Sequence, residues 1–134
     1  MASILKVDTL TGVTTAGSIS VTGEGNSTTT NLQQGLAKVW ASANTAGDAL
    51  FDSFNVSSLT DTATGRQTYG IANDMANKSY SIVHGCGNDD NGSARHLITQ
   101  NVTTAVYEVA SYNTGATAVV DSTGTCSVVN GDLA

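Results

Sequence analysis

The sequence predicts an all-β protein, in which an N-terminal strand-like arm precedes an antiparallel β-sandwich or barrel of about seven to eight strands. Thr, Ser, Asn and Gly dominate the composition, charged residues make up only 12%, and proline is absent. Thr and Val suit half-buried pleated surfaces, whereas the scarcity of Lys, Glu and Leu disfavours helices. Short alternating segments recur between clusters of Gly, Asn, Asp and Ser, which is typical of a sandwich or a barrel.

Residues 1–31 are expected to form the arm. The opening segment, MASILKVDTL, alternates partly between apolar and polar side chains and indicates a strand with one buried face. A shorter alternating run covers residues 18–22, and a Ser/Thr tract ends at residue 31. Because so few apolar atoms cannot stabilise a lone two-stranded element, the arm needs a partner, either the outer domain or symmetry copies of itself. The side chains expected to make this contact are Ile4, Leu5, Val7, Leu10, Ile19 and Val21.

Residues 32–134 are expected to form the β-domain, as a meander of short strands. The expected strands cover residues 36–43, 50–59, 67–72, 80–86, 94–103, 105–112, 117–120 and 126–130. Residues 88–92 (NDDNG) predict a polar turn, because Asn-Gly suits positive φ. Large aromatic side chains dominate burial, which places Trp40, Phe51, Phe54 and Tyr69 in the core. Tyr80, Tyr107 and Tyr112 are expected in the core or a subunit interface, and the alternative is that they contact sugar.

Two histidines and two cysteines are the candidates for site chemistry. On a hairpin of residues 80–103, His84 and His96 would face each other near Cys86, Asp89 and Asp90, as in a metal site. The favoured alternative is a half-buried His84 and a surface His96. A disulfide between Cys86 and Cys126 requires neighbouring strands, and two separate buried thiols are the favoured state.

Catalysis has no support in the sequence. A Cys-His hydrolase needs a lowered thiol pKa, but Cys86 lies between two glycines with no predicted helix N-terminus beside it. Asp48 and Asp52 lack the aromatic cluster that a glycoside hydrolase uses to hold a sugar. We therefore expect no enzyme and no catalytic residue, cofactor or metal.

Charge and hydropathy exclude two classes of partner. The net charge of −6 and the absence of a basic patch disfavour nucleic acid, whose binding needs Lys and Arg. No apolar run approaches the length of a membrane helix, and no signal peptide is recognisable. We expect a chain that is made in a cytoplasm and contacts neither nucleic acid nor membrane.

Two segments resemble a known family. MASILKVDTL, followed by a Thr/Gly/Ser-rich stretch, resembles the start of many virion structural proteins of marine tailed bacteriophages. Residues 52–65 (DSFNVSSLTDTATG) resemble the opening of the β-rich outer domain of those fibre-like proteins. The resemblance implies a homotrimeric virion protein whose N-terminal segment attaches to the particle or intertwines about a three-fold axis, while the β-domain is displayed outward.

The resemblance and the short chain together favour a capsid decoration (cement) protein or a head fibre that stabilises or decorates the capsid exterior. Its expected partners are further copies of itself and the major capsid protein or other virion proteins, and its expected location is the virion, after synthesis in the host bacterial cytoplasm. One alternative is a short tail fibre that recognises a host-surface glycan receptor. The other is a free lectin-like binding module.

Overall fold

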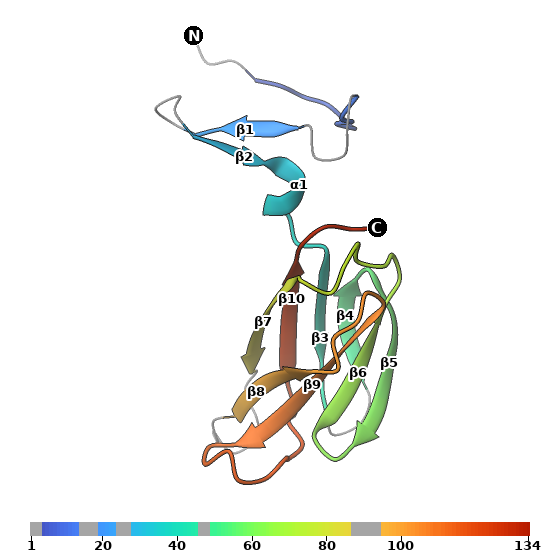
Figure 1. The fold of residues 1–134 in the computed structure, drawn as a ribbon. Coiled ribbons are helices and arrows are strands. Elements are labelled where there is room, and N and C mark those ends of the chain that lie inside the picture. The colour runs from blue at the N-terminus through green and yellow to red at the C-terminus, as the bar shows by residue number, and fades with distance from the viewer. Residues whose placement is uncertain (1–3, 14–18, 24–27, 46–48, 87–94) are drawn as a thin grey trace. The chain divides into compact units, whose positions relative to one another are not determined.

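The computed structural model describes residues 4–13, 19–23, 28–45, 49–86 and 95–134. Strands account for 53% of the structure and helix for 4%, which confirms the all-β prediction. The chain divides into two compact units, Met1–Leu36 and Ala37–Ala134 (Figure 1). Residues 32–36, expected in the β-domain, therefore belong to the N-terminal unit.

The described residues of the N-terminal unit form a short hairpin and a helical turn. Strand β1 (Ser20–Thr22) pairs antiparallel with β2 (Thr29–Asn31), with Val21 opposite Thr30. Helix α1 (Leu32–Gly35) follows at once, because the side chain of Asn31 caps it: Asn31 Oδ1 accepts a hydrogen bond from the backbone N–H of Gln34 at 3.1 Å. The cap explains why a helical turn begins directly at the end of a strand.

The strand expected at the start of the chain is absent from its described part. Residues 4–13 adopt neither helix nor strand, and the β1–β2 pairing takes up none of them. A strand forms when its backbone N–H and C=O groups find a neighbouring strand. Within the described chain this segment finds no neighbouring strand, so the strand expected from the alternation of its residues does not form there.

The C-terminal unit is a sandwich-like pair of four-stranded antiparallel sheets (Figure 1). Sheet I has the order β4-β3-β10-β7, and sheet II has the order β5-β6-β9-β8. The strands of sheet I are β3 (Val39–Ala43), β4 (Leu50–Phe54), β7 (Ser81–Cys86) and β10 (Thr125–Asn130). Those of sheet II are β5 (Val56–Ala63), β6 (Arg66–Ile71), β8 (Arg95–Gln100) and β9 (Val106–Asn113). The described strands thus match the number expected from the sequence.

Two of the expected strands are wrong in detail. The single strand expected over residues 50–59 is two strands in different sheets, because Asn55 between them takes a left-handed conformation with φ of 59°. The Asn55 side chain fixes this corner: it donates to the carbonyl of Lys38 at 3.0 Å and accepts from the N–H of Asn73 at 2.8 Å. The strand expected over residues 117–120 is reduced to an isolated bridge between Tyr112 and Val119. The turn expected at residues 88–92 lies outside the described residues.

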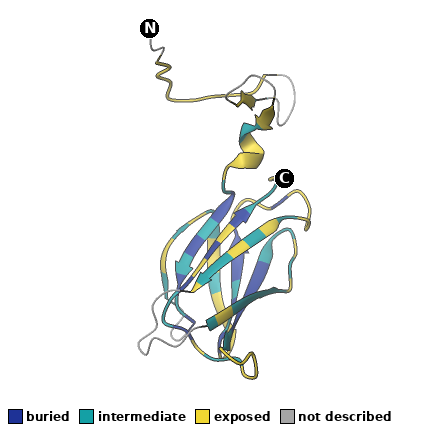
Figure 2. Cartoon of the chain, turned by 90° about the vertical axis from the view of Figure 1, so that its left-hand side faces the viewer, coloured by how far each residue is buried: buried dark blue, intermediate teal, exposed yellow. Residues whose placement is uncertain are grey.

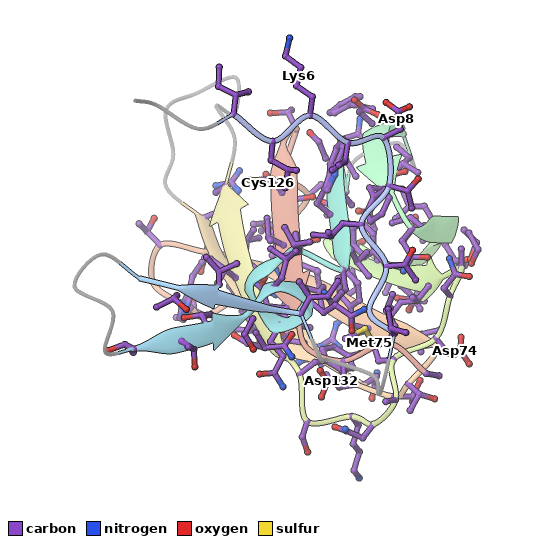
Figure 3. All side chains as sticks on the ribbon, turned by 90° about the horizontal axis from the view of Figure 1, so that it is seen from above. Lys6, Asp8, Asp74, Met75, Cys126 and Asp132 are labelled. Carbon is purple, nitrogen blue, oxygen red and sulfur yellow. The ribbon has the colours of Figure 1, made fainter. Side chains whose placement is uncertain are left out.

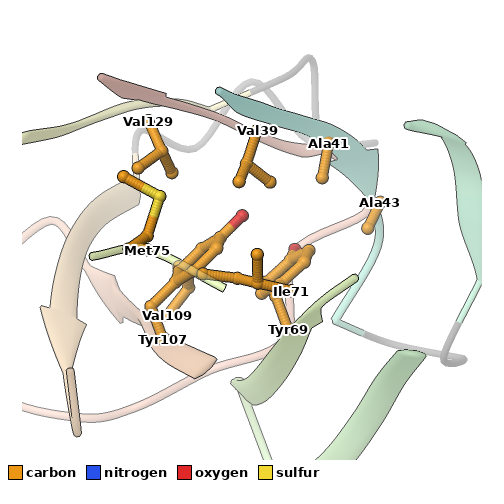
Figure 4. Packing of buried hydrophobic residues seen from close by; sticks show 9 residues of the cluster. All are labelled: Val39, Ala41, Ala43, Tyr69, Ile71, Met75, Tyr107, Val109 and Val129. Carbon is orange, nitrogen blue, oxygen red and sulfur yellow. The ribbon is translucent and has the colours of Figure 1, made fainter. Parts of the chain in front are cut away.

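Two tyrosines fill the space between the sheets (Figure 4). The rings of Tyr69 and Tyr107 stack in parallel, with centroids 4.9 Å apart. Their hydroxyls reach the opposite sheet, where Tyr69 shares a hydrogen bond with Thr125 (3.2 Å) and Tyr107 shares one with Ser127 (2.6 Å). Ala41 lies in the same cluster on sheet I, so small residues there leave room for the large rings of sheet II.

Three of the aromatic residues that were expected in the core lie outside it. Tyr69 and Tyr107 are buried as predicted, but Trp40 is only half-buried and Phe51 and Phe54 are exposed. The reason is the alternation of β3, since Val39, Ala41 and Ala43 point inward and Trp40 must then point outward. Figure 2 shows the same alternation of buried and exposed residues along the strands.

The C-terminal segment is fastened to the domain by long-range pairing. Met75 forms an antiparallel bridge with Leu133, and the N–H of Ala76 donates to the carbonyl of Asp132 at 2.9 Å (Figure 3). The Met75 side chain is fully buried in the core cluster. The pairing therefore closes one end of the sandwich over its apolar interior.

Candidate interaction surfaces

The first surface is the N-terminal segment of residues 4–13, which exposes its apolar side chains. Ile4 and Leu5 are 78% and 79% exposed, and Val7 and Leu10 are 56% and 55% exposed. Lys6 and Asp8, both labelled in Figure 3, bring one charge of each sign. Contiguous exposed apolar side chains are typical of surfaces that contact other molecules, so this segment is a candidate contact surface.

The two remaining predicted contact residues lie on or beside the hairpin. Val21 is half-exposed on β1, and Ile19, which precedes β1, is half-buried. The carbonyl of Ile19 accepts a hydrogen bond from the N–H of Leu32 at 2.8 Å, which ties the two ends of the hairpin together. This bond is made by the backbone, so the half-buried side chain of Ile19 and the half-exposed side chain of Val21 both stay candidate contact residues.

The second surface is a row of apolar side chains across the outer face of sheet I, which the sequence analysis missed. Directly opposed residues of an antiparallel sheet point to the same face. Phe54 is opposite Trp40, Trp40 is opposite Val128, and Val128 is opposite Val83. These four residues, called the apolar row below, cross all four strands of the sheet. Phe54 is 54% exposed and Val83 61%, so the row lies open.

The residues beside the apolar row are small or polar. The neighbouring set of opposed residues is Asp52, Ser42, Cys126 and Gly85. The alternation of β3 contained a signal for this face, because Val-Trp-Ala-Ser-Ala puts the three smaller apolar residues on one side and Trp40 on the other. The expectation that Trp40 is buried rested on its size and ignored this alternation.

The histidines do not meet. Strands β7 and β8 lie in different sheets, so the expected hairpin that brought His84 and His96 face to face is wrong. His84 Nε2 lies 2.6 Å from Thr99 Oγ1, which links the two sheets, and His96 is exposed. Asp89 and Asp90 lie outside the described residues, and among those described no three His, Cys, Asp or Glu side chains gather into a metal-binding group.

His84 is held in a partly apolar setting. Burial lowers the pKa of His84 below its ordinary value of 6.5, because the charged imidazolium loses hydration there. Its Nδ1 is buried and has no hydrogen-bond partner in the described structure. The opposed residue on β10 is Ser127, whose hydroxyl is bound to Tyr107. His84 is therefore a half-buried strand residue, as the sequence analysis favoured.

The two cysteines lie on neighbouring strands but leave sheet I on opposite faces. Cys86 is opposite Thr125, which is buried, whereas Cys126 is opposite Gly85 on the outer face. Both thiols are free and exposed, so the expectation of buried thiols is wrong. Cys126 Sγ donates to the carbonyl of Gly85 at 3.2 Å, and its side chain is labelled in Figure 3. The disposition excludes an intrachain disulfide without rearrangement of the sheet.

A buried carboxylate on sheet II has a structural explanation. Glu108 is 6% exposed, and its Oε1 accepts from Arg66 at 3.1 Å while its Oε2 accepts from Asn101 at 2.7 Å. Arg66 also donates to Gln100. Both carboxylate oxygens are thus engaged in joining β6 to β8 and β9. Of the other acids considered, Asp48 lies outside the described residues and Asp52 is exposed on the face of sheet I.

Comparisons with known proteins give no indication of function, so the surfaces described above are the basis for interpreting the chain. Among the described residues, no helix has the length and apolar character that crossing a membrane requires. The chain matches no known protein family, no curated protein and no solved structure.

Proposed function

We propose that this chain is a non-enzymatic structural protein of a bacteriophage virion, a small homotrimer that decorates the capsid exterior as a cement or head-fibre protein. The N-terminal unit makes the contacts of assembly, and the sandwich faces outward. The observation that carries the proposal is that residues 4–10 expose their apolar side chains while the sandwich of the same chain has its own buried core. The resemblance of residues 1–10 and 52–65 to phage virion proteins supplies the setting.

The energetics support an assembly role for this segment. Fully burying an aliphatic side chain of this size contributes roughly 1.5–3 kcal/mol. Ile4, Leu5, Val7 and Leu10 offer several such contributions, and leaving all of them in water has no benefit for an isolated chain. A partner that covers them gains most of that free energy.

Trimerisation is tested on the purified chain by analytical ultracentrifugation over a range of concentrations. Wild type is expected to sediment as a trimer, and replacement of Ile4, Leu5, Val7 and Leu10 by Ser is expected to give monomers with an unchanged β-sheet circular dichroism spectrum. The matched control changes Thr9 and Thr11 of the same segment to Ser and keeps the trimer. A wild-type monomer at every concentration, in solution and on particles, contradicts the trimer.

The capsid role is tested by comparing particles with and without the protein. A cement protein binds the assembled shell and not its dissociated subunits, so it stabilises the shell by linkage. Particles that lack it are expected to release DNA at a lower temperature and still adsorb to host cells at the normal rate. Unchanged melting together with lost adsorption contradicts decoration and supports the tail-fibre alternative.

One observation favours the second candidate, a glycan-binding tail fibre or lectin-like module. The exposed Phe54 and the half-buried Trp40 are opposed on one sheet face, and aromatic rings at a surface are suited to stacking on sugars. The chain contains one tryptophan, so its emission isolates this site. Saturable changes in that emission on titration with host-surface glycan support the receptor function, and decoration expects none.

A further inference from the structure

The two open apolar surfaces fit each other. We propose that residues 4–10 of one copy lie across the apolar row of a second copy, so that each sandwich carries the arm of its neighbour. The inference rests on the proposed homotrimer and names the contact that builds it. It assigns the arm to contacts between subunits, with the capsid bound by other surfaces of the assembly.

The spacing of the two surfaces agrees. Ile4, Val7 and Leu10 recur every third residue, and in an extended chain with three residues per turn they fall on one side, about 9.3 Å apart. Strands of a sheet lie about 4.8 Å apart, so every second strand recurs at about 9.6 Å. The four members of the apolar row span about 14 Å. An arm lying across the strands therefore places two successive apolar side chains on alternate members of the row, and the third lies past its edge.

The charges constrain how the arm lies. Around the apolar row, the opposed set next to it contains one carboxylate, that of the exposed Asp52. The arm segment carries Lys6 and, two residues later, Asp8. The favoured placement therefore brings Lys6 of one copy near Asp52 of the next and keeps Asp8 away from it. An exposed pair of this kind contributes about 0–1 kcal/mol, so it orients the arm more than it holds it.

The contact area calls for a closed assembly. From their exposed fractions, the row and the arm each offer on the order of 300 Å² of apolar surface, since a large aromatic side chain carries about 150–250 Å². One arm-to-face contact thus removes about 600 Å², below the roughly 1,200 Å² of a stable pairwise interface. In a closed assembly each copy makes two such contacts, one through its arm and one through its row, and the last contact to form is intramolecular. A reciprocal pair and a three-membered ring both meet this condition, and the proposed homotrimer corresponds to the ring.

Cross-linking between two differently marked copies tests this arrangement. The donor copy carries Val7→Cys with Cys86→Ser and Cys126→Ser, and the acceptor carries Cys86→Ser and keeps the native Cys126, which lies on the outer face beside the row. A short bis-maleimide reagent is expected to join donor to acceptor in the mixed trimer. The matched control acceptor has Cys86→Ser, Cys126→Ser and Thr60→Cys, which puts an exposed thiol on sheet II, and it is expected to cross-link at least tenfold less.

The outcomes separate this inference from the proposed function. Trimers that sediment normally but cross-link equally to both acceptors overturn the arm-to-face contact and leave the trimer intact. A monomer at all concentrations overturns both. Cross-links that join the donor thiol only to capsid protein, on particles, show that the arm binds the shell and also overturn the inference.

The emission of Trp40 gives an independent readout without a cross-linker. Covering the row with a neighbour's arm removes water from the half-exposed indole, so emission is expected to shift to shorter wavelength as the concentration rises through the trimerisation range. Val7→Ser should abolish the shift, and Thr9→Ser should keep it. A trimer whose Trp40 emission equals that of the monomer contradicts coverage of the row.

Discussion

The hydrogen bond between Tyr107 and Ser127 offers the sharpest test of how the sandwich is held together. The two hydroxyl oxygens lie 2.6 Å apart, Tyr107 is fully buried and Ser127 is 3% exposed. Tyr107→Phe keeps the stacked ring and leaves the Ser127 hydroxyl buried without this partner. Such an orphaned group costs about 1–3 kcal/mol. The apparent Tm is expected to fall by about 4–8 °C for each kcal/mol lost from a domain of this size.

A double-mutant cycle distinguishes the hydrogen bond from simple loss of a hydroxyl. Ser127→Ala orphans the Tyr107 hydroxyl and should cost a similar amount, while the double variant removes both polar groups and should be less destabilised than the sum. Urea denaturation followed by circular dichroism gives the free energies of unfolding, and Tyr112→Phe, outside the core cluster, is the control. Strictly additive losses would refute the coupling of the two sheets through this pair.

Three further changes test local features of the sandwich. Because burial lowers the folded-state pKa of His84, the unfolded chain takes up a proton first as the pH falls through 6.5, so the free energy of unfolding should decline from there down to the folded-state pKa. Urea titrations across this pH range should show a flatter profile for His84→Gln than for wild type, and identical profiles would contradict the assignment. Gly65 has φ of 64°, and an added Cβ would lie 2.5 Å from the carbonyl oxygen of Val120, so Gly65→Ala should lower the free energy of unfolding by more than about 1–2 kcal/mol, measured by thermal melting. Gly115→Ala is the control, because the nearest atom to its added Cβ lies 3.6 Å away. Asn55→Gly keeps the left-handed corner and loses the side-chain hydrogen bonds, and Asn55→Ala adds backbone strain, so stability should fall in the order wild type, Gly, Ala; equal stability of the three would contradict the corner.

The strands that the sequence predicted well are short segments bounded by turn residues. Residues 67–72 lie between Gly65 and Asn73, and strand β6 covers Arg66–Ile71; residues 126–130 end at Gly131, and strand β10 covers Thr125–Asn130. The division of residues 50–59 was missed because Asn55 looks like an ordinary polar strand residue, and only its contacts with Asn73 and Lys38 reveal a corner. Long-range contacts of this kind leave no periodic signal along the chain.

The candidate surfaces were predicted unequally, for a physical reason. The exposed apolar residues of the arm follow from their isolation in the sequence, although the strand expected for them does not form within the described chain. The apolar row depends on the strand order β4-β3-β10-β7, which brings Phe54, Trp40, Val128 and Val83 together from distant segments. Strand order is determined by packing between sheets, and the two tyrosines that fill the core decide which aromatic residues remain outside.

The central claim, that the chain is a capsid decoration protein, is tested most directly by its stoichiometry in purified virions. Quantitative mass spectrometry of intact particles and of heads separated from tails measures its ratio to the major capsid protein. The account predicts a fixed ratio to that protein, with a copy number divisible by three, in both preparations. Absence of the chain from virions contradicts the claim. If its amount instead changes in parallel with the tail proteins and it is missing from isolated heads, the chain belongs to the tail.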